Sequence, residues 1–459
     1  MKLKTTAILA VVFAGLLVFV LFFEKKPREA GAGPEAKLVS LAAADVEFVS
    51  LKQGPEILSF RKNDKGEWMI AEPMEAKADT VEVEALVSAL ADLRIERIVE
   101  AAGGDPKKYD IPQREISLRV KGQAEPVKIL LGPENKLDAT FYAQKVGDPR
   151  IVLLPSTLKT PLDKKLFDFR QKDVFRFEAK DVAAVKLRAK DSRWEARKTD
   201  GEWFFTSPLK VLARESQMTS LLESLAGLRA KEFAAEAKTP QELKARGLEV
   251  PEYTISLSLP AESRELVFSF HKAEDKTYAT TSQSTKIIVP EADILFDLER
   301  KPADLRESKV AVFGAWQADQ LMLKKGGLAI TVHKAANANW FFDPAEKEEA
   351  DGSKVETFLR KIEGLEAAEY IDAPKGPAEY GLDNPGAEIA IRTKDTASEK
   401  PVEKTVRLAV GKVDAEKKQA VVKNARFAWL VKADASFLDE FPKEKKDWAA
   451  LPPAAPEKK

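Results

Sequence analysis

The sequence predicts an α+β protein in which one N-terminal transmembrane helix precedes three tandem similar modules, each an antiparallel sheet with a covering helix. Two observations carry this prediction. Three tryptophans, Trp68, Trp203 and Trp340, lie 135 and 137 residues apart in the same local setting. An interval that long is a whole small domain rather than one turn of a solenoid. The chain also opens with an uncharged, apolar run from Thr5 to Phe23.

The repeat is visible at positions other than the tryptophans. Gly66-Glu67-Trp68 recurs as Gly201-Glu202-Trp203. Three prolines are each followed four residues later by an isoleucine, and these prolines are Pro112, Pro251 and Pro385. Because independent positions keep one register, we interpret the three tryptophans and the three prolines as structural markers of the repeat.

These intervals also predict the organisation of the chain. Its 459 residues suit about three domains of ordinary size. The predicted segments are a transmembrane anchor over 1–23, a flexible linker over 24–40, repeats over 41–174, 175–311 and 312–448, and a disordered tail over 449–459. The linker is charged and rich in glycine, alanine and proline, and the tail is rich in proline, which are compositions that do not pack a core.

Each repeat combines strands with one amphipathic helix. In the second repeat, Val185 and Leu187 begin a strand, and Asp200-Gly201 supplies a hairpin turn before Trp203. In the first repeat, apolar residues three and four apart predict a helix with one buried face, and they are Val83, Leu86, Val87, Leu90 and Leu93. Asp79, three residues before Glu82, resembles the start of a capping box.

Four further strands are expected after this helix. They run through 116–120, 127–131, 141–142 and 151–154, and we expect Gly132 to close the second of them. Because strand patterns outnumber helical ones, each repeat is predicted to be an antiparallel α+β domain with a helix on one face of the sheet.

The N-terminal run predicts the compartment. Its 19 residues are close to the roughly 20 that cross a bilayer as a helix. Lys2 and Lys4 precede it and a stretch of mixed charge follows, which favours a cytoplasmic N-terminus. We therefore expect a single-pass inner-membrane protein that contacts the lipid bilayer through residues 5–23 and holds its repeats in the periplasm. A cleaved signal peptide ending near Ala30-Gly31-Ala32 is the competing interpretation.

Composition argues against several classes of function. Lys+Arg and Asp+Glu are equal at 74 each, so no net field would attract nucleic acid. The absence of cysteine excludes disulfides, thiolate zinc sites and a cysteine nucleophile. We predict no nucleic-acid partner, no metal and no cofactor.

Catalytic patterns are missing as well. The sequence holds no nucleophile elbow, zinc-protease motif, phosphate-binding loop or dinucleotide fingerprint. Of the two histidines, His333 aligns with Arg197 and Arg61 at a basic strand position and is expected to be solvated. His271 is expected to end a strand, at a place where the other repeats have Gly132 and Gly411, so nothing brings the histidines together. We predict that the protein is not an enzyme.

Two other features allow a functional and a structural interpretation. The tryptophans could form an aromatic ligand platform, but their place on strands just after turns favours core residues. The acidic stretch 343–351 could be offered as a calcium loop, but it lacks the ligand order of such loops. We expect a solvated loop before the third helix.

Several of these motifs together resemble the bacterial family called domain of unknown function 4340, over about residues 40–445. They are the N-terminal anchor, the hairpin ending in Gly-x-Trp, the helical Leu-x-x-Leu-Arg at 90–94 and 225–229, and Tyr-Gly-Leu-Asp-x-Pro at 380–385. The first repeat departs from the pattern, because its residues 109–112 lack the Gly-Leu pair. The resemblance implies a membrane-anchored envelope protein, often encoded beside ABC-type export systems, and it carries over no catalytic or binding residue.

Two hypotheses about function follow. The first is a non-enzymatic scaffold or accessory protein that binds an envelope partner, such as subunits of an ABC-type transporter. The second is a carboxylate-dependent hydrolase or carbohydrate-binding protein, which predicts acidic residues near a pocket in one repeat, with 343–351 as the candidate. A cytoplasmic adaptor with reversed topology is a minor third.

Overall fold

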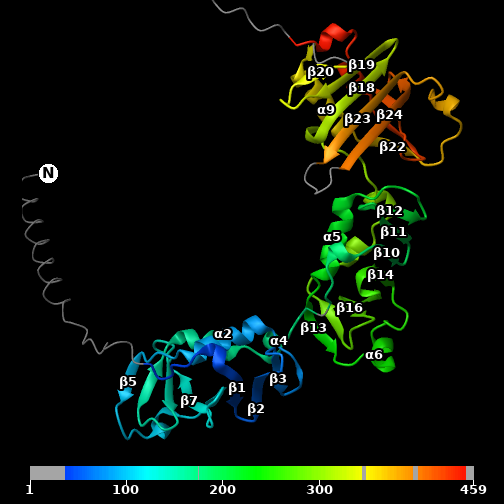
Figure 1. Ribbon diagram of the computed structural model, residues 1–459. Helices are drawn as coiled ribbons and strands as arrows, with labels where there is room; N and C mark the ends of the chain where they lie inside the picture. The colour runs from blue at the N-terminus through cyan, green and yellow to red at the C-terminus, as the bar shows by residue number, and fades with distance from the viewer. Residues whose placement is uncertain (1–36, 174, 344–347, 396–401, 451–459) are drawn as a thin grey trace, which may run out of the picture. The chain divides into compact units, whose positions relative to one another are not determined.

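The computed structural model describes residues 37–173, 175–343, 348–395 and 402–450 (Figure 1). They form three antiparallel sheets of nine, eight and nine strands with few helices, so the described protein is mostly β. The chain divides between Val174 and Phe175 into two compact units. No helix in the described ranges is long and apolar enough to cross a membrane, and the predicted anchor at 5–23 lies outside those ranges.

The first sheet belongs to the first compact unit, and we call this part of the chain module 1. Its strands lie in the order β4-β3-β2-β1-β6-β7-β8-β9-β5. They are β1 (Val46–Gln53), β2 (Glu56–Lys62), β3 (Trp68–Glu72), β4 (Ala76–Lys77), β5 (Arg97–Glu100), β6 (Arg114–Val120), β7 (Val127–Glu134), β8 (Phe141–Lys145) and β9 (Ile151–Leu154). Its helices are α2 (Thr80–Ala91), α3 (Lys159–Asp163) and α4 (Leu166–Phe169).

The second compact unit holds the other two sheets, in modules 2 and 3. Module 2 contains β10 (Ala184–Arg188), β11 (Arg193–Thr199), β12 (Glu202–Ser207), β13 (Ala230–Ala235), β14 (Tyr253–Leu259), β15 (Arg264–Ala273), β16 (Lys276–Thr281), β17 (Ile287–Pro290), α5 (Glu215–Ala226), α6 (Pro240–Ala245), α7 (Leu295–Leu298) and α8 (Pro302–Leu305). Its strand order is β12-β11-β10-β14-β15-β16-β17-β13.

Module 3 repeats this topology, with the order β21-β20-β19-β18-β23-β24-β25-β26-β22. Its elements are β18 (Ala318–Lys325), β19 (Leu328–Lys334), β20 (Trp340–Phe342), β21 (Glu349–Ala350), β22 (Ala367–Ile371), β23 (Ala387–Asp395), β24 (Val402–Asp414), β25 (Gln419–Asn424), β26 (Leu430–Asp434) and α9 (Gly352–Glu363). In each module the strand that follows the long helix returns to pair with the last strand at the edge of the sheet.

The three sheets share one register at their centre, which makes positions comparable between modules. In each, a leucine of the first strand lies opposite one residue of the second strand and an isoleucine of the middle strand. These triplets are Leu51 with Leu58 and Ile116, Leu187 with Trp194 and Ile255, and Leu323 with Ile330 and Ile389.

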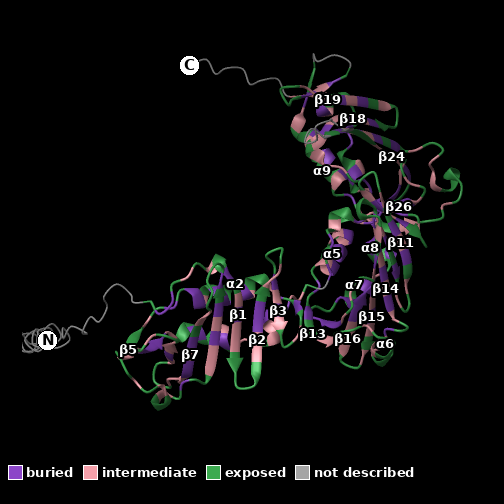
Figure 2. Cartoon of the chain, turned by 60° about the horizontal axis from the view of Figure 1, so that its bottom comes forward, coloured by how far each residue is buried: buried purple, intermediate pink, exposed green. Residues whose placement is uncertain are grey.

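One 12-residue helix supplies an apolar face to each core. In module 1, α2 buries Val83, Leu86 and Leu90 in the core. Figure 2 marks the buried segments of the chain in purple. Asp79 begins this helix, because its carboxylate accepts hydrogen bonds from the backbone N–H groups of Val81 and Glu82 at 3.1 and 3.4 Å. This is ordinary N-capping, which satisfies donors that have no partner inside the helix.

The marker tryptophans lie at the start of the third strand of modules 1 and 3, and one residue inside that strand in module 2. Trp68, Trp203 and Trp340 are 2, 1 and 1% exposed. They are core residues, and their rings form no exposed platform. A lysine of the preceding strand lies over each ring, and these lysines are Lys62, Lys198 and Lys334.

The structure extends the modules beyond the predicted segments at both ends. Leu38 and Val39, within the predicted linker, are each 3% exposed, and the N–H of Leu38 donates to the carbonyl of Leu93 at 2.8 Å. Ala449 and Ala450, within the predicted tail, pair with the short strand β21. These apolar residues bury surface in the adjacent module, which is why they are ordered with it. The other domain boundaries stay predictions.

Two strand ends were predicted wrongly. β7 continues past Gly132 to Glu134, and β15 continues past His271 to Ala273. Gly132 is needed for a different reason, since a Cβ there would lie 2.6 Å from the carbonyl oxygen of Tyr109. Gly411 makes the same room for a backbone carbonyl in module 3. In module 2 the residue at this position is His271, and the glycine lies on the facing segment instead. A Cβ on Gly247 would overlap the imidazole of His271.

Candidate functional site

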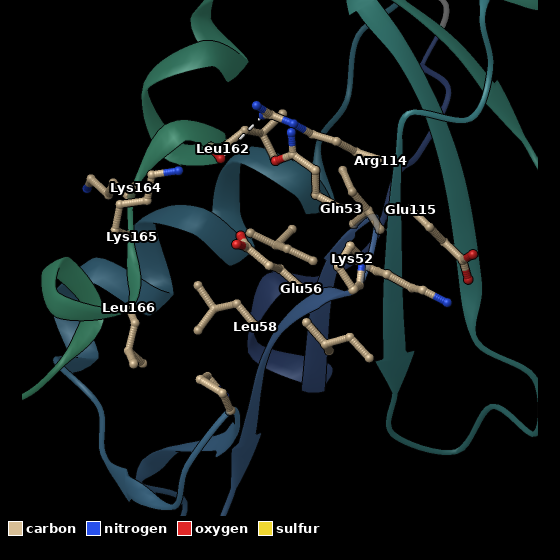
Figure 3. A pocket seen from close by; sticks show the side chains of 15 residues that line it. Lys52, Gln53, Glu56, Leu58, Arg114, Glu115, Leu162, Lys164, Lys165 and Leu166 are labelled. Atoms are coloured by element: carbon tan, nitrogen blue, oxygen red, sulfur yellow. Dashed lines mark hydrogen bonds between the residues drawn. The ribbon is translucent and has the colours of Figure 1, made fainter.

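A cavity of about 560 Å³ lies in module 1 at the tip of the β1–β2 hairpin (Figure 3). We call it the hairpin-tip pocket, and it is lined by residues 51–53, 55–58, 73, 114–116, 162 and 164–166. Its walls are therefore the hairpin tip, the start of β6 and the segment that joins α3 to α4. The volume falls within the range of small-molecule binding sites, about 300–1,000 Å³.

The floor of the hairpin-tip pocket is apolar. Leu51, Leu58 and Leu166 are half-buried and pack against the core of module 1, while Ile116 below them is 1% exposed. Figure 3 shows Leu58 and Leu166 on facing walls of the cavity. Apolar side chains that a neighbouring group could cover are therefore left open to the cavity, and covering them would be favourable by about 25 cal/mol per Å² buried.

The rim holds charged groups in fixed positions. Arg114 donates from Nη2 to Asp163 at 3.0 Å and from Nη1 to the carbonyl of Leu162 at 3.3 Å, and Lys164 forms an ion pair with Glu82. Burial acts to raise the pKa of Asp163, but hydrogen bonds from Arg114 and Lys159 outweigh it and lower that pKa overall. Asp163 is therefore an anion at neutral pH and holds Arg114 in place.

One further charged side chain reaches into the cavity. The carboxylate of Glu56 points into the cavity, whereas Lys52 and Glu115 point away from it (Figure 3). Within the described ranges the side chain of Glu56 has no hydrogen-bond or ion-pair partner. The hairpin-tip pocket therefore offers a free acceptor beside an apolar floor.

A repeated N-cap aligns the ends of the three modules, at α4 in module 1, at α8 in module 2 and at the short 3₁₀ helix Lys445–Trp448 in module 3. The carboxylates of Asp168, Asp304 and Asp447 accept hydrogen bonds from the backbone N–H groups of Lys165, Lys301 and Glu444, at 2.7, 3.0 and 3.0 Å. Counting back from these caps, Lys164 corresponds to Arg300. In the same way Leu162 corresponds to Leu298 and Phe441.

Module 2 fills the equivalent place with its own side chain. Trp194 stands at the register position of Leu58 and is fully buried. Its indole N–H donates to the carbonyl of Arg300 at 3.3 Å, and its ring meets Phe205 edge-on at 5.3 Å. An aromatic ring with a satisfied N–H is a stable core component.

The pairing of Arg114 with Asp163 in module 1 also has a counterpart in module 2. Tyr253 stands where module 1 has Arg114, and its hydroxyl donates to Glu299 at 2.7 Å. Burial, and then the hydrogen bond to Glu299, raises the pKa of Tyr253. Outside Trp194 a cavity of about 450 Å³ remains, lined mostly by charged side chains.

Module 3 fills the region equivalent to the hairpin-tip pocket from the wall that corresponds to Leu162. Phe441 stands at the position of Leu162, is 6% exposed and packs edge-on against Phe358 at 5.1 Å. The ammonium group of Lys325 lies 5.2 Å from the centre of the Phe441 ring and donates to the carbonyl of Leu438 at 2.8 Å. Modules 2 and 3 thus each supply one aromatic ring, whereas module 1 has leucine at both positions.

Comparison with known families agrees with the repeat. A family model described as "Domain of unknown function (DUF4340)" matches residues 68–239 and again residues 203–385. The two matches overlap and together cover more than half of the chain, and they begin at the equivalent residues Trp68 and Trp203. The chain belongs to the DUF4340 family.

Other comparisons add no argument about this DUF4340 protein. A DNA polymerase sliding clamp from Pseudomonas aeruginosa is 9% identical, with 86% of this chain and 93% of that chain covered and a TM-score of 0.16. The DNA polymerase III subunit beta from Pseudomonas aeruginosa is also 9% identical, with 86% and 94% covered and a TM-score of 0.14. Scores this low establish no common fold. No curated protein matches the chain.

The two histidines of the DUF4340 protein lie in different sheets. His333 is less solvated than expected, because its side chain is 20% exposed and its Nδ1 lies 2.5 Å from a carboxylate oxygen of Asp343. His271 lies against Gly247, as described above. The marker prolines Pro112, Pro251 and Pro385 precede the middle strands and belong to no pocket described here.

The acidic stretch 343–351 serves structural contacts where the structure describes it. Asp343 contacts His333, Glu348 pairs with Lys445, and Asp351 caps α9. The expectation of a simple solvated loop is wrong for Glu349–Ala350, which form the strand β21 because they pair with β20. Within the described ranges no group of three or more histidine, cysteine, aspartate or glutamate residues could hold a metal ion.

Proposed function

We propose that this DUF4340 protein binds a protein partner in the bacterial envelope, through module 1, and has no catalytic activity of its own. The observation that carries the proposal is the hairpin-tip pocket. One scaffold occurs three times, two copies cover this apolar place with an aromatic ring of their own, and the first copy leaves it open. Binding sites are commonly apolar cavities in which a few polar groups at fixed positions orient the bound group.

The setting of this binding is part of the proposal. The apolar run at 5–23 anchors the chain in the inner membrane, with the modules in the periplasm. The family resemblance and the balanced charge support a role as a scaffold or accessory component of an ABC-type transport system. The partner is then a transporter subunit or another envelope protein rather than nucleic acid.

Crosslinking in native membranes tests the proposal. A photoreactive residue replaces Pro55 at the hairpin tip of the full-length protein, and the products are purified and identified by mass spectrometry. We expect one reproducible partner at this position. A control protein carries the same photoreactive residue at Leu137, which is 95% exposed elsewhere in module 1, and should not capture that partner. An anchored protein that yields no reproducible partner contradicts the proposal.

A further inference from the structure

The geometry points to the chemistry of the group that the hairpin-tip pocket receives. We propose that this group is an indole ring, the side chain of a tryptophan presented by the partner protein. The inference rests on the proposed function, because it names how the partner would be held. The internal repeat supplies the template, since module 2 shows what the same scaffold holds at this place.

The strand register indicates the size of the group that the hairpin-tip pocket receives, because it shows which side chain module 2 has at the same position. Leu58 pairs with Leu51, and Trp194 pairs with the equivalent Leu187. The two side chains therefore project from equivalent points of equivalent hairpins. In module 2 the triplet Leu187, Trp194 and Ile255 is buried to at least 99%. In module 1 the corresponding Leu51 and Leu58 are only partly buried beside the cavity. An aromatic ring above Leu58 would give module 1 the packing that module 2 already has.

The hydrogen-bonding groups suit an indole. A buried indole N–H needs an acceptor, and Trp194 finds one in the carbonyl of Arg300 at 3.3 Å. The corresponding carbonyl in module 1 belongs to Lys164, which lines the pocket. The carboxylate of Glu56 is a second acceptor that points into the cavity (Figure 3). A purely alkyl group would leave the Glu56 carboxylate facing an apolar surface.

The cations at the rim also favour an aromatic ring. Arg114 and Lys164 line the pocket, and a cation near the face of an indole is attracted to it. Module 3 shows this combination at the same place, with Lys325 over the ring of Phe441 at 5.2 Å. Tryptophan is moreover one of the residues, with tyrosine and arginine, that are enriched at the buried centres of protein interfaces.

Binding of N-acetyl-5-fluorotryptophanamide to the full chain, followed by fluorine NMR, tests the inference. We expect a dissociation constant of about 0.1–1 mM, the range for a ligand of this size. Leu58→Trp places the ring of module 2 in the pocket and should weaken binding by about tenfold or more, while Leu166→Glu should weaken it by charging the floor. Leu137→Trp, at the exposed site, should bind as the wild type does.

The outcomes separate this inference from the proposed function. Equal binding by the wild type and Leu58→Trp, or tighter binding of decanoate than of the tryptophan amide, overturns the inference, and the second result would identify an alkyl site. If Leu58→Trp still crosslinks the partner at wild-type yield, the inference fails and the proposed function stands. If the amide binds as expected but the wild type captures no partner, only the proposed function fails.

Discussion

Trp194→Leu is expected to lower the free energy of unfolding of module 2 by about 3 kcal/mol or more, toward the value for losing a buried tryptophan. The indole is fully buried, donates to the carbonyl of Arg300 and packs edge-on against Phe205. A leucine would restore none of these contacts and would leave a cavity. Hydrogen exchange of peptides from β10, β11 and β14 in the full chain measures the loss, with peptides from module 1 as an internal reference.

Two further readouts make this prediction specific. Free indole should slow the exchange of Trp194→Leu, because a dry cavity left by a deleted side chain binds an apolar molecule of matching shape. Trp316→Leu is the matched control, since Trp316 is 73% exposed and its loss should change stability by less than about 0.5 kcal/mol. If hydrogen exchange in Trp194→Leu is as slow as in the wild type, Trp194 does not stabilise module 2. It would then be no guide to the group that fits above Leu58.

Trp203→Ala is expected to cost module 2 about 3–5 kcal/mol, the usual range for removing a buried tryptophan. The ring is 1% exposed and also carries Lys198 over its face. Because the chain has no cysteine, a single cysteine at the fully buried Ala279 is a unique probe of opening. Its labelling rate should rise by about 10²–10³-fold or more, since each 1.4 kcal/mol changes the open population tenfold.

The control for this labelling is a cysteine in another module. Ala143 is also fully buried, but it belongs to module 1. Its labelling should not change in Trp203→Ala, because contacts in the core of module 2 are absent from module 1. Equal acceleration at both cysteines would mean that the modules unfold together, which would contradict their description as separate cores.

Much of the fold could be predicted because it depends on local chemistry. The hairpin turn before Trp203 needs two residues with positive φ, and Asp200 and Gly201 adopt 51° and 83°. The cap at Asp79 could be predicted because an aspartate just before a helical pattern accepts hydrogen bonds from the first backbone N–H groups of the helix. The third strands could be placed because a tryptophan after a turn, followed by apolar residues, packs into a core. The edge strands β4 and β21 are two residues long, too short for any pattern.

The hairpin-tip pocket could not be predicted because its walls are distant in sequence. Leu58 and Leu162 come together only when the hairpin, β6 and the segment after α3 are assembled. A partial signal was present, since the interval that aligns His333 with Arg197 and Arg61 also aligns Trp194 with Leu58. That alignment shows that module 2 has a tryptophan at the position where module 1 has the smaller leucine. It does not show whether another side chain compensates, as Phe441 does in module 3.

The exchange between glycine and histidine has the same explanation. The sequence identifies His271 as a residue that stands where Gly132 and Gly411 are found in the other repeats. It does not show that Gly247, on a different segment, supplies the space for the imidazole. Compensation between segments is a property of packing, so it becomes visible only in three dimensions.

The stability of Leu58→Trp in the full chain shows whether the hairpin-tip pocket is an open site or part of a closed core. If the hairpin-tip pocket is the open counterpart of the place that Trp194 fills, the added ring covers Leu51 and Leu166. Hydrogen exchange in β1, β2 and β6 should then be as slow as in the wild type or slower. If Leu58 instead faces a closed core, the larger ring would cost about 1–3 kcal/mol. Exchange in these strands would then become about tenfold to a hundredfold faster, and the hairpin-tip pocket would not be an open binding site.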